Sequence, residues 1–384
     1  AFDKLVNPEQ SPFFNWSKPF VQLETTRGCF NTCAFCVSGG EKPVRTLSVE
    51  AIRERVRLIH EKGIRNIRVL DRTFNYQAKA LFDLFREFPD MRFHLEIHPA
   101  LLSEELKKEL ASMPKGLLHL EAGIQSLHEE VLTVSRRAGK LADALEGLRY
   151  LCALDNMETH ADLIAGLPLY HLSQIFDDVR TLAEYRAGEI QLESLKLLPG
   201  TEMRRRAEEL GICYSPLPPY EVLQTREITP DELQTARQLS RLLDGFYNAP
   251  AWQEITRRLI VEEPGFLTRF LDHLIQIGVI DQPMGLERRG ILLYHFCKEH
   301  YPHFLTAMSR AWIEAGMSLK KEPAERVRTK HVTPPEAWTV CTGTYRDDLR
   351  LCKLPAPEEG RCYWYGFETE SQQLRPVFAA VSQE

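Results

Sequence analysis

The chain has 384 residues, 43% of them hydrophobic and 27% charged, with a formal net charge of −6. This hydrophobic fraction excludes intrinsic disorder, and the acidic excess argues against binding nucleic acid through net charge. No uninterrupted apolar run approaches the roughly 20 residues that a membrane helix needs, so we expect no membrane partner. The chain begins AFDKLVNPEQ, without Met and without a signal-peptide pattern, which predicts a fragment or a processed chain.

Residues 18–206 alternate between short apolar runs and longer amphipathic stretches. Strands are predicted at residues 20–24, 67–70, 93–97, 117–122, 159–165 and 189–195. Helices are predicted between them at residues 48–62, 77–87, 103–111, 128–134, 141–153 and 172–185, with N-caps at Ser48, Ser103 and Ser173. Alternating strands and helices indicate an α/β fold with a parallel sheet, and six β/α units fit a partial or open barrel.

The pattern changes after Gly211. A Pro-rich connector at residues 214–220 leads to helices predicted at residues 232–247, 251–263, 266–277, 289–300 and 304–315. Residues 318–330 are charged and predict a solvated linker, and the tail contains β-rich runs at residues 338–341 and 363–367. We therefore expect four regions: a lead-in at 1–17, an α/β core at 18–211, a helical domain at 212–317, and a charged linker with a small β-rich tail at 318–384.

Three of the nine cysteines, Cys29, Cys33 and Cys36, form a C-x3-C-x2-C motif directly after the first predicted strand. Three thiolates on one short loop reach three corners of a cubane iron–sulfur cluster and leave its fourth iron open to a small molecule. The alternatives are three unrelated buried thiols or a structural zinc site. A zinc site normally uses four Cys or His ligands, and the next candidate is His60 inside a predicted helix. A tight trio in a long chain is also typical of a reducing cytosol, so we expect a cytoplasmic protein.

With Phe35 as the aromatic residue before Cys36, the motif resembles that of the radical S-adenosylmethionine (SAM) superfamily, over roughly residues 18–206. The resemblance implies a [4Fe-4S] cluster whose open iron chelates the amino and carboxylate groups of SAM. It implies that an electron from the cluster cleaves SAM to methionine and a 5′-deoxyadenosyl radical, which abstracts hydrogen from a substrate. It also implies a reductant partner such as flavodoxin or ferredoxin.

The resemblance assigns SAM contacts to further residues near the strand ends. They are Asp71, Glu96, Gly123, Gln125, Arg137, Asp162 and Gly200. Glu96 resembles the acid that contacts the SAM amino or ribose groups, and Gln125 and Asp162 resemble ribose contacts. Arg137 resembles the arginine that pairs with the SAM carboxylate, and Gly200 lies in a Pro-Gly-Thr turn expected beside the adenine. A polar residue at a strand end is, however, often a helix cap or an ion-pair partner.

One element departs from the superfamily pattern. The family usually has a Gly-Gly-Glu element after the second strand, where backbone groups hold the SAM amino group. Here that strand is followed by Asp71, Arg72 and Thr73, which would have to replace it, while a Gly-Gly-Glu sequence at residues 39–41 falls inside the cysteine loop. The contact to the SAM amino group is therefore expected to differ from the family pattern.

The segments DRTFN, HLEIHP, EAGIQS and DLIAGLP resemble one subgroup of the superfamily. Its members join an N-terminal cobalamin-binding domain to the radical SAM core and a C-terminal domain of unassigned function. The sequence has no D-x-H-x-x-G, the element that supplies a histidine to cobalt. Two expectations follow: a full-length chain would be a cobalamin-free relative, and a fragment would have residues 1–17 as the remnant of a missing cobalamin-binding module. If the chain is such a fragment, cobalamin is an expected cofactor, and methyl transfer to an unactivated carbon or phosphorus is the implied reaction.

Three functions remain open. The first is a radical SAM enzyme, a transferase in the cobalamin case, that acts on a small molecule. The second is an RNA-modifying enzyme of the methylthiolating type, which predicts a basic C-terminal module that the acidic composition does not favour. The third is a metal-binding scaffold without catalysis, which would need the cysteines but not Gln125, Asp162 and a matching arginine.

Two further groups of side chains could carry chemistry, or could be structural. Histidines near the barrel mouth are candidate acid–base groups, and three tail cysteines are candidates for a second cluster or a zinc site. These residues are His94, His98, His160, Cys341, Cys352 and Cys362.

A six-unit core leaves an open side at which a radical would meet water. Residues 214–317 are therefore predicted to pack against the core and close the barrel, with Tyr220 and Phe246 among the contacts. An independent domain on a flexible linker is the alternative.

Overall fold

The computed structural model describes residues 6–76, 79–356, 359–368 and 375–383. The chain divides into two compact units, Ala1–Leu243 and Asp244–Glu384. The first unit is an α/β domain, and the second combines helices with a small antiparallel sheet. Within the described ranges, the helices are too short or too polar for any of them to cross a membrane.

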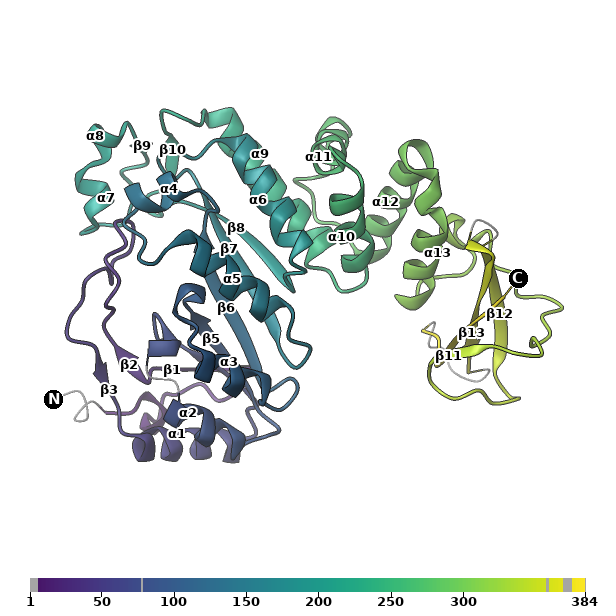
Figure 1. Ribbon diagram of the computed structural model, residues 1–384, viewed down its shortest axis with the longest axis horizontal. Helices are drawn as coiled ribbons and strands as arrows, with labels where there is room; N and C mark the ends of the chain where they lie inside the picture. The colour runs from purple at the N-terminus through teal and green to yellow at the C-terminus, as the bar shows by residue number, and fades with distance from the viewer. Residues whose placement is uncertain (1–5, 77–78, 357–358, 369–374, 384) are drawn as a thin grey trace. The chain divides into compact units, whose positions relative to one another are not determined.

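The first unit is built on a six-stranded parallel sheet (Figure 1). Its strands, in spatial order, are β1 (Val21–Leu23), β4 (Asn66–Val69), β5 (Arg92–Ile97), β6 (Leu118–Gln125), β7 (Glu158–Ala165) and β8 (Glu189–Ser194). All neighbouring pairs are parallel, and the spatial order is the chain order. Since the order ends at β1 on one side and β8 on the other, the sheet is an open barrel, and the predicted α/β fold class is confirmed.

Helices fill the connections between these strands. They are α1 (Val49–Glu61), α2 (Lys79–Arg86), α3 (Glu104–Ala111), α4 (Glu129–Val134), α5 (Leu141–Cys152) and α6 (Leu172–Glu184). Ser48 and Ser103 cap α1 and α3 as predicted, each accepting a hydrogen bond from a backbone amide. The predicted cap at Ser173 is wrong, because α6 begins earlier, with His171 as N-cap and Gln174 closing a capping box. The first two residues of the predicted helix at 77–87 lie outside the described ranges.

The two faces of the sheet differ in chemistry. On β5, Phe93, Leu95 and Ile97 are at most 4% exposed and pack under the helical layer. The alternate residues, His94 and Glu96 among them, point to the inside of the barrel and are half-buried. Because side chains on a strand alternate between faces, the same strand carries both the packing core and a polar interior.

Within the described part of the first unit, four short strands lie outside the main sheet, and they were not predicted. β2 (Thr26–Arg27) and β3 (Arg45–Thr46) pair antiparallel at the base of the cysteine loop. β9 (Cys213–Tyr214) and β10 (Val222–Gln224) form a second two-stranded pair, after the short helices α7 (Glu202–Arg205) and α8 (Ala207–Leu210). Strands of two or three residues are too short to show an alternating pattern in the sequence.

The segment that follows the Pro-rich connector is divided between the two units. α9 (Pro230–Leu242) packs against α6 and β8 and belongs to the first unit, which extends 32 residues beyond the predicted core boundary at residue 211. Tyr220 also lies in this unit, where its carbonyl accepts from the amide of Leu197. Phe246 lies in the second unit, so its predicted contact with the core stays a prediction.

The second unit packs helices against the tail sheet. A π-helical turn at Leu243–Tyr247 is followed by α10 (Gln253–Glu262), α11 (Phe266–Gln276), α12 (Leu286–His300) and α13 (Leu305–Glu314). The antiparallel sheet has the order β11 (Thr339–Thr342), β14 (Phe378–Gln383), β13 (Arg361–Phe367) and β12 (Arg350–Ala356). Ile313 of α13 joins a buried cluster with Leu354 and Tyr365 of the sheet, so the helices and the tail share one core.

The charged segment at residues 318–330 is not a solvated linker, contrary to the prediction. It forms a short 3-10 helix, Glu322–Ala324, in which Pro323 and Ala324 are buried. Glu322 pairs with His295 and Lys298 of α12 at 2.8 and 2.5 Å. The segment therefore packs on the helices of the second unit, because its charges have specific partners there.

Gly147 tests the packing of α5 against the short 3-10 helix Pro99–Leu101. A Cβ atom at Gly147 would lie 2.1 Å from the carbonyl oxygen of Pro99. Replacing a helical glycine by alanine normally raises the free energy of unfolding by about 1 kcal/mol. Here the clash reverses the sign, and Gly147→Ala is expected to lower it by about 1–3 kcal/mol in chemical denaturation. A stabilised variant would show that the two elements do not approach this closely.

Candidate active site

The three clustered cysteines lie on the loop between β2 and β3, just beyond the carboxyl end of β1. Cys29 and Cys33 are 7% and 6% exposed, Cys36 is half-buried, and all three thiols are free. The amide of Cys29 donates to the carbonyl of Glu41 over 2.9 Å and closes the base of the loop. The amide of Cys36 donates to the carbonyl of Cys33 over 3.1 Å, which makes a tight turn between two of the thiols.

Two glycines allow the loop to wind this tightly. Gly28 has a φ of +105°, and a Cβ atom there would lie 2.6 Å from the carbonyl oxygen of Glu41. A Cβ atom at Gly39 would lie 2.7 Å from the carbonyl oxygen of Cys33. Both distances are too short for a side chain, so glycine is required at both positions. Gly39 therefore belongs to the cysteine loop, as the sequence predicted.

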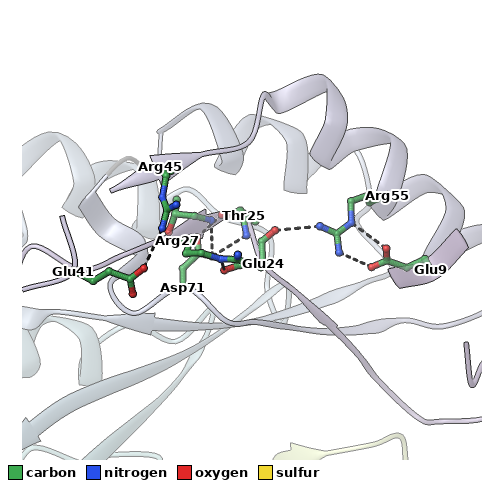
Figure 2. Close-up of polar contacts among 9 residues, drawn as sticks. Glu9, Glu24, Thr25, Arg27, Glu41, Arg45, Arg55 and Asp71 are labelled. Atoms are coloured by element: carbon green, nitrogen blue, oxygen red, sulfur yellow. Dashed lines mark hydrogen bonds and ion pairs between the residues drawn. The ribbon is translucent and has the colours of Figure 1, made fainter. Parts of the chain in front are cut away.

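Asp71 holds the start of the loop (Figure 2). Its carboxylate accepts hydrogen bonds from the amides of Thr25 and Thr26, both at 2.8 Å, and a short one from the hydroxyl of Thr25. Asp71 is 1% exposed and Thr25 is fully buried, and burial raises the pKa of Asp71 while these hydrogen bonds oppose the shift. The carboxylate that was predicted to face SAM is thus engaged by the chain that leads into the cysteines, and Asp71 is a positioning residue in this structure.

Ion pairs surround the same base. Arg55 of α1 pairs with Glu9 at 2.6 Å and also donates to the carbonyl of Glu24 over 3.2 Å. The Arg55 side chain is 7% exposed and that of Glu9 is fully buried, so each charge depends on the other. Arg27 donates through two nitrogens to both carboxylate oxygens of Glu24 (Figure 2). These contacts tie the lead-in segment, β1 and α1 to the entrance of the loop.

The thiols of the loop fit a cluster held by three cysteines. Burial raises the pKa of the Cys29 thiol, and the neighbouring thiols of Cys33 and Cys36 raise it further. Nη1 of Arg137 lies 3.6 Å from Sγ of Cys33 and brings a positive charge to the thiols. Among the described residues, no three Cys, His, Asp or Glu side chains converge as the ligands of a single ion would. A cubane differs, because each iron takes its own thiolate.

Contacts from distant segments fix the far side of the loop. Arg137 donates to the carbonyl of Gly123 at the end of β6 as well as to Cys33. The amide of Ala34, between the cysteines, donates to the carbonyl of Ser135 over 2.8 Å. The amide of Met203 in α7 donates to the carbonyl of Ala34, also over 2.8 Å. The loop is therefore held between the segment after β6 and the segment after β8.

The predicted SAM contacts on β5, β6 and β7 lie in neighbouring registers of the sheet. Glu96 is opposite Glu121, and Gly123 is opposite Asp162. A Cβ atom at Gly123 would lie 2.5 Å from Nε2 of Gln125, so the glycine leaves room for that side chain. Gln125 has a φ of 72°, a left-handed conformation that is strained for a residue other than glycine. The structure thus brings these residues together on the inner face, at the carboxyl ends of the strands.

The remaining two predicted contacts lie at the edges of this region. Phe35 is half-buried on the cysteine loop. Gly200 has a φ of +87° in the turn between β8 and α7, and a Cβ atom there would meet no described atom within 4 Å. Thr201 follows it and caps α7. The turn therefore leaves space beside the Gly200 backbone, and a planar ligand would need such space to lie against it.

Glu96 carries a strongly shifted pKa. Burial and the charge of Glu121 raise the pKa of Glu96 to about 7, although Arg72, His94 and Arg137 act in the opposite direction. Asp162 is affected similarly, because burial and Glu121 raise its pKa well above the usual range. Clustered carboxyl groups with raised pKa values are typical of functional sites, since they bind cations and exchange protons near neutral pH.

A buried network behind β6 was missed by the sequence analysis. Asp178 of α6 is 2% exposed and accepts from the amide of Leu127 over 2.8 Å and from the hydroxyl of Tyr170. Its other oxygen lies 3.1 Å from Nε2 of His128. This carboxylate connects the segment after Gln125 with the segment after β7. The available signal was an aspartate on the otherwise apolar face of α6.

The barrel histidines occupy two different environments. His94, His119 and His160 lie on the inner face, with the rings of His94 and His119 stacked at 4.6 Å. His119 was not predicted. His98 instead lies beyond the end of β5, is 3% exposed, and has its pKa lowered to about 3 by burial and by Arg137. His98 is therefore neutral near pH 7, whereas the other three face the barrel interior.

The tail cysteines do not form one site. Cys352 packs in a buried cluster with Leu354 and Tyr365, and Cys362 packs in a separate cluster with Trp364. Cys341 is exposed on the edge strand β11. Because Cys352 and Cys362 lie in different clusters of the sheet, the hypothesis of a second cluster or zinc site held by the three is wrong.

Two family models match the chain. The Radical SAM superfamily model matches residues 23–182, and the model of a protein of unknown function, DUF4080, matches residues 208–304. The chain therefore carries a radical SAM domain, followed by a domain of unassigned function, and the predicted resemblance is confirmed.

Curated relatives are methylthiotransferases by name. The chain is 26% identical over 213 residues to a tRNA-2-methylthio-N(6)-dimethylallyladenosine synthase of Herpetosiphon aurantiacus, covering 50% of this chain and 47% of that protein. It is 27% identical over 178 residues to the ribosomal protein uS12 methylthiotransferase RimO of Prochlorococcus marinus, covering 42% of this chain and 41% of that protein. The chain thus spans about half the length of the curated relatives that it matches, or less.

Among solved structures, part of the chain is similar to the radical SAM methyltransferase TsrM of Kitasatospora setae, solved with cobalamin and a [4Fe-4S] cluster bound. It is 16% identical, with a TM-score of 0.44, and the match covers 55% of this chain and 41% of that chain.

The role of Asp71 can be tested by Asp71→Asn. The amide keeps the shape but presents a donor where Thr25 and Thr26 also donate, so at least one buried hydrogen bond is lost. We expect the free energy of unfolding to fall by about 1–3 kcal/mol in chemical denaturation. The iron retained after anaerobic reconstitution should fall as well, because the loop entrance loosens. Asp83→Asn on the exposed face of α2 is the control, and equal behaviour of both variants would contradict this role.

Proposed function

We propose that this protein is a radical SAM enzyme that binds a [4Fe-4S] cluster through Cys29, Cys33 and Cys36. The observation that carries the proposal is the tightly wound loop that holds these thiols near one another beside Arg137, at the carboxyl ends of the barrel strands. The cluster, when bound, supplies the electron that cleaves SAM to methionine and a 5′-deoxyadenosyl radical able to abstract hydrogen from a substrate. A flavodoxin- or ferredoxin-type reductant is the proposed electron donor.

The side chains around the loop have distinct proposed roles. Arg137 pairs with the SAM carboxylate, since its guanidinium already lies between Cys33 and the end of β6. Glu96 accepts from the SAM amino group, and Gln125 and Asp162 hydrogen-bond its ribose. The space at Gly200 receives the adenine face. The inner face of the open barrel encloses these groups and limits the access of water to the reacting atoms.

Two group transfers are compatible with this chemistry. Methylthiolation is favoured by the curated relatives, whose names state tRNA and a ribosomal protein as their targets. Cobalamin-dependent methyl transfer to a small molecule is favoured by the subgroup resemblance of the DRTFN, HLEIHP, EAGIQS and DLIAGLP segments. The acidic composition of the chain favours the small molecule as substrate.

Product analysis distinguishes these possibilities. The anaerobically reconstituted protein is incubated with SAM and a reductant, with and without added cobalamin. The proposed function requires 5′-deoxyadenosine. Additional S-adenosylhomocysteine that depends on cobalamin would identify methyl transfer, and the absence of 5′-deoxyadenosine from an iron-loaded protein would contradict the radical SAM assignment.

Replacing any one of Cys29, Cys33 and Cys36 by alanine is expected to abolish the cluster. Two thiolates cannot hold a cubane that takes three, so the wild-type content of roughly four irons per chain should fall toward zero. Cys152→Ala is a matched control, because this half-buried thiol lies on α5 outside the loop. Iron and sulfide analysis with electronic absorption measures the outcome. Wild-type protein that binds zinc and no iron under anaerobic conditions would refute the assignment.

The raised pKa of Glu96 predicts a pH-dependent affinity for SAM. Below pH 7 the carboxyl group is protonated and neutral, and above it the group becomes an anion that attracts the SAM ammonium group. The dissociation constant should therefore be about tenfold lower at pH 7.5 than at pH 5.5, equivalent to about 1.4 kcal/mol. Glu96→Gln should bind SAM with little pH dependence over this range. Calorimetry measures both, with iron content checked at each pH, and an unchanged slope in the variant would remove Glu96 from the SAM site.

A further inference from the structure

The strand that carries Gln125 ends irregularly. β6 and β7 pair in register up to Gly123 and Asp162. The pairing then skips Ile124, so Gln125 lies opposite Leu163. Gln125 also has a φ of 72°. A left-handed backbone costs free energy in a residue other than glycine, and it persists only where surrounding contacts impose it. Contacts from outside the strand therefore have to hold this end of β6.

The irregular end determines where the Gln125 side chain lies. A Cβ atom at Gly123 would lie 2.5 Å from Nε2 of Gln125 and 3.7 Å from Nη2 of Arg137. The carboxamide of Gln125 is thus folded back over Gly123, near the guanidinium that reaches Sγ of Cys33. Because the direction of a side chain follows its backbone dihedral angles, relaxation of the left-handed φ would move this carboxamide relative to Arg137.

The contacts that hold the end of β6 come from Asp178 of α6. Oδ2 of Asp178 accepts from the amide of Leu127, two residues after Gln125, over 2.8 Å. The same oxygen lies 3.4 Å from Oγ of Ser126, which in turn accepts from the amide of His128 over 3.2 Å. Ser126 is fully buried, so water does not compete for these contacts. Asp178 thereby fixes the backbone immediately after Gln125.

The same carboxylate reaches the loop between β7 and α6. The hydroxyl of Tyr170, a fully buried residue of this loop, donates to the oxygen that accepts from Leu127. The other oxygen of Asp178 lies 3.1 Å from Nε2 of His128. Nδ1 of His128 is 3.2 Å from Nε2 of Gln174, so this ring is also held from α6. Asp178 therefore joins the segment that follows β6 to the segment that follows β7.

Helix packing alone does not explain a carboxylate at this position. The other buried residues of the same face of α6 include Ile175, Val179 and Leu182. An apolar side chain would pack equally well there, whereas a buried carboxylate is costly unless donors replace its water. The hydrogen bonds that Asp178 accepts within the described structure come from the loops after β6 and β7. The charge therefore serves these two loops.

We propose that Asp178 is a positioning residue for SAM binding, and that it holds Gln125 in the left-handed conformation from which the carboxamide reaches the SAM ribose. The assignment rests on the proposed function, because that function makes Gln125 a SAM contact. Asp178 acts only through the backbone of residues 126 and 127, so its effect on SAM binding has to pass through Gln125.

A double-mutant cycle of Asp178→Ala and Gln125→Ala tests the proposal. SAM is titrated by calorimetry into the anaerobically reconstituted full chain. Each single substitution is expected to weaken SAM binding by about tenfold, since each removes the hydrogen bond to the ribose. The double variant should bind SAM no more weakly than Gln125→Ala alone, because without the Gln125 carboxamide Asp178 has nothing left to position.

A second variant and a control separate positioning from folding. Tyr170→Phe keeps the carboxylate but removes one of its donors, and it should weaken SAM binding by about threefold, again without effect in the Gln125→Ala background. It carries the test if Asp178→Ala does not fold. Asp177→Ala is the matched control, because this neighbouring residue of α6 is exposed, and it should bind SAM like the wild type. Iron content and chemical denaturation are measured on the same samples.

Wild-type SAM affinity in both network variants, with only their stability lowered, would show a purely structural role and overturn the proposal. Losses of affinity that add in full to that of Gln125→Ala would also overturn it, as would a Gln125→Ala variant with unchanged affinity. The radical SAM assignment is scored separately by 5′-deoxyadenosine. Wild-type protein that binds SAM without forming this product would reject only that assignment, whereas wild-type protein that does not bind SAM would reject both.

Discussion

One buried carboxylate connects the barrel to the proposed cluster. Asp71 stands at the end of β4, and its oxygens accept from the amides of Thr25 and Thr26 and from the hydroxyl of Thr25. A carboxylate that is 1% exposed is tolerated only when donors replace its water, and here the donors are the residues that lead into Cys29. The same hydrogen bonds therefore replace water around this carboxylate and fix the position of the loop. The loop cannot move away without leaving a buried anion without partners.

The rest of the loop is held by segments that are far away in the sequence. Arg137 reaches Cys33 from the segment after α4, and Met203 reaches the backbone of Ala34 from α7. These contacts join residues that are distant along the chain, so the loop reaches its final conformation only when β6 and β8 are in the sheet. This dependence explains why the thiols are largely buried although they lie on a loop. A preformed pocket for three thiolates reduces the conformational entropy that cluster binding has to overcome.

The sequence predicts the barrel well because each strand leaves an apolar signal and each connection is amphipathic. It predicts the cysteine site for a different reason, since three thiols at this spacing have few structural uses. It could not predict that the Asp71 side chain points toward the cysteine loop, because the sequence alone does not determine the orientation of a carboxylate at a strand end. His119 was missed because it looks like one polar interruption of an apolar run, and only the register with β5 places it beside His94. The sequence also did not predict that residues 318–330 pack on α12, because a run of charged residues does not indicate which side chains it will pair with.

The two faces of the sheet differ in composition, and this difference affects which substrates the barrel can accept. Residues such as Leu95 and Leu120 point outward, and their burial under the helices stabilises the sheet. The inward positions therefore do not have to be apolar. Their composition then reflects the contents of the barrel. The inward positions of β5, β6 and β7 are occupied largely by histidines and carboxylates, and His94 lies 2.6 Å from Glu121 across the two strands. A substrate inside the barrel therefore has to match polar side chains that are partly buried, because an apolar group there would leave their hydrogen bonds unmade.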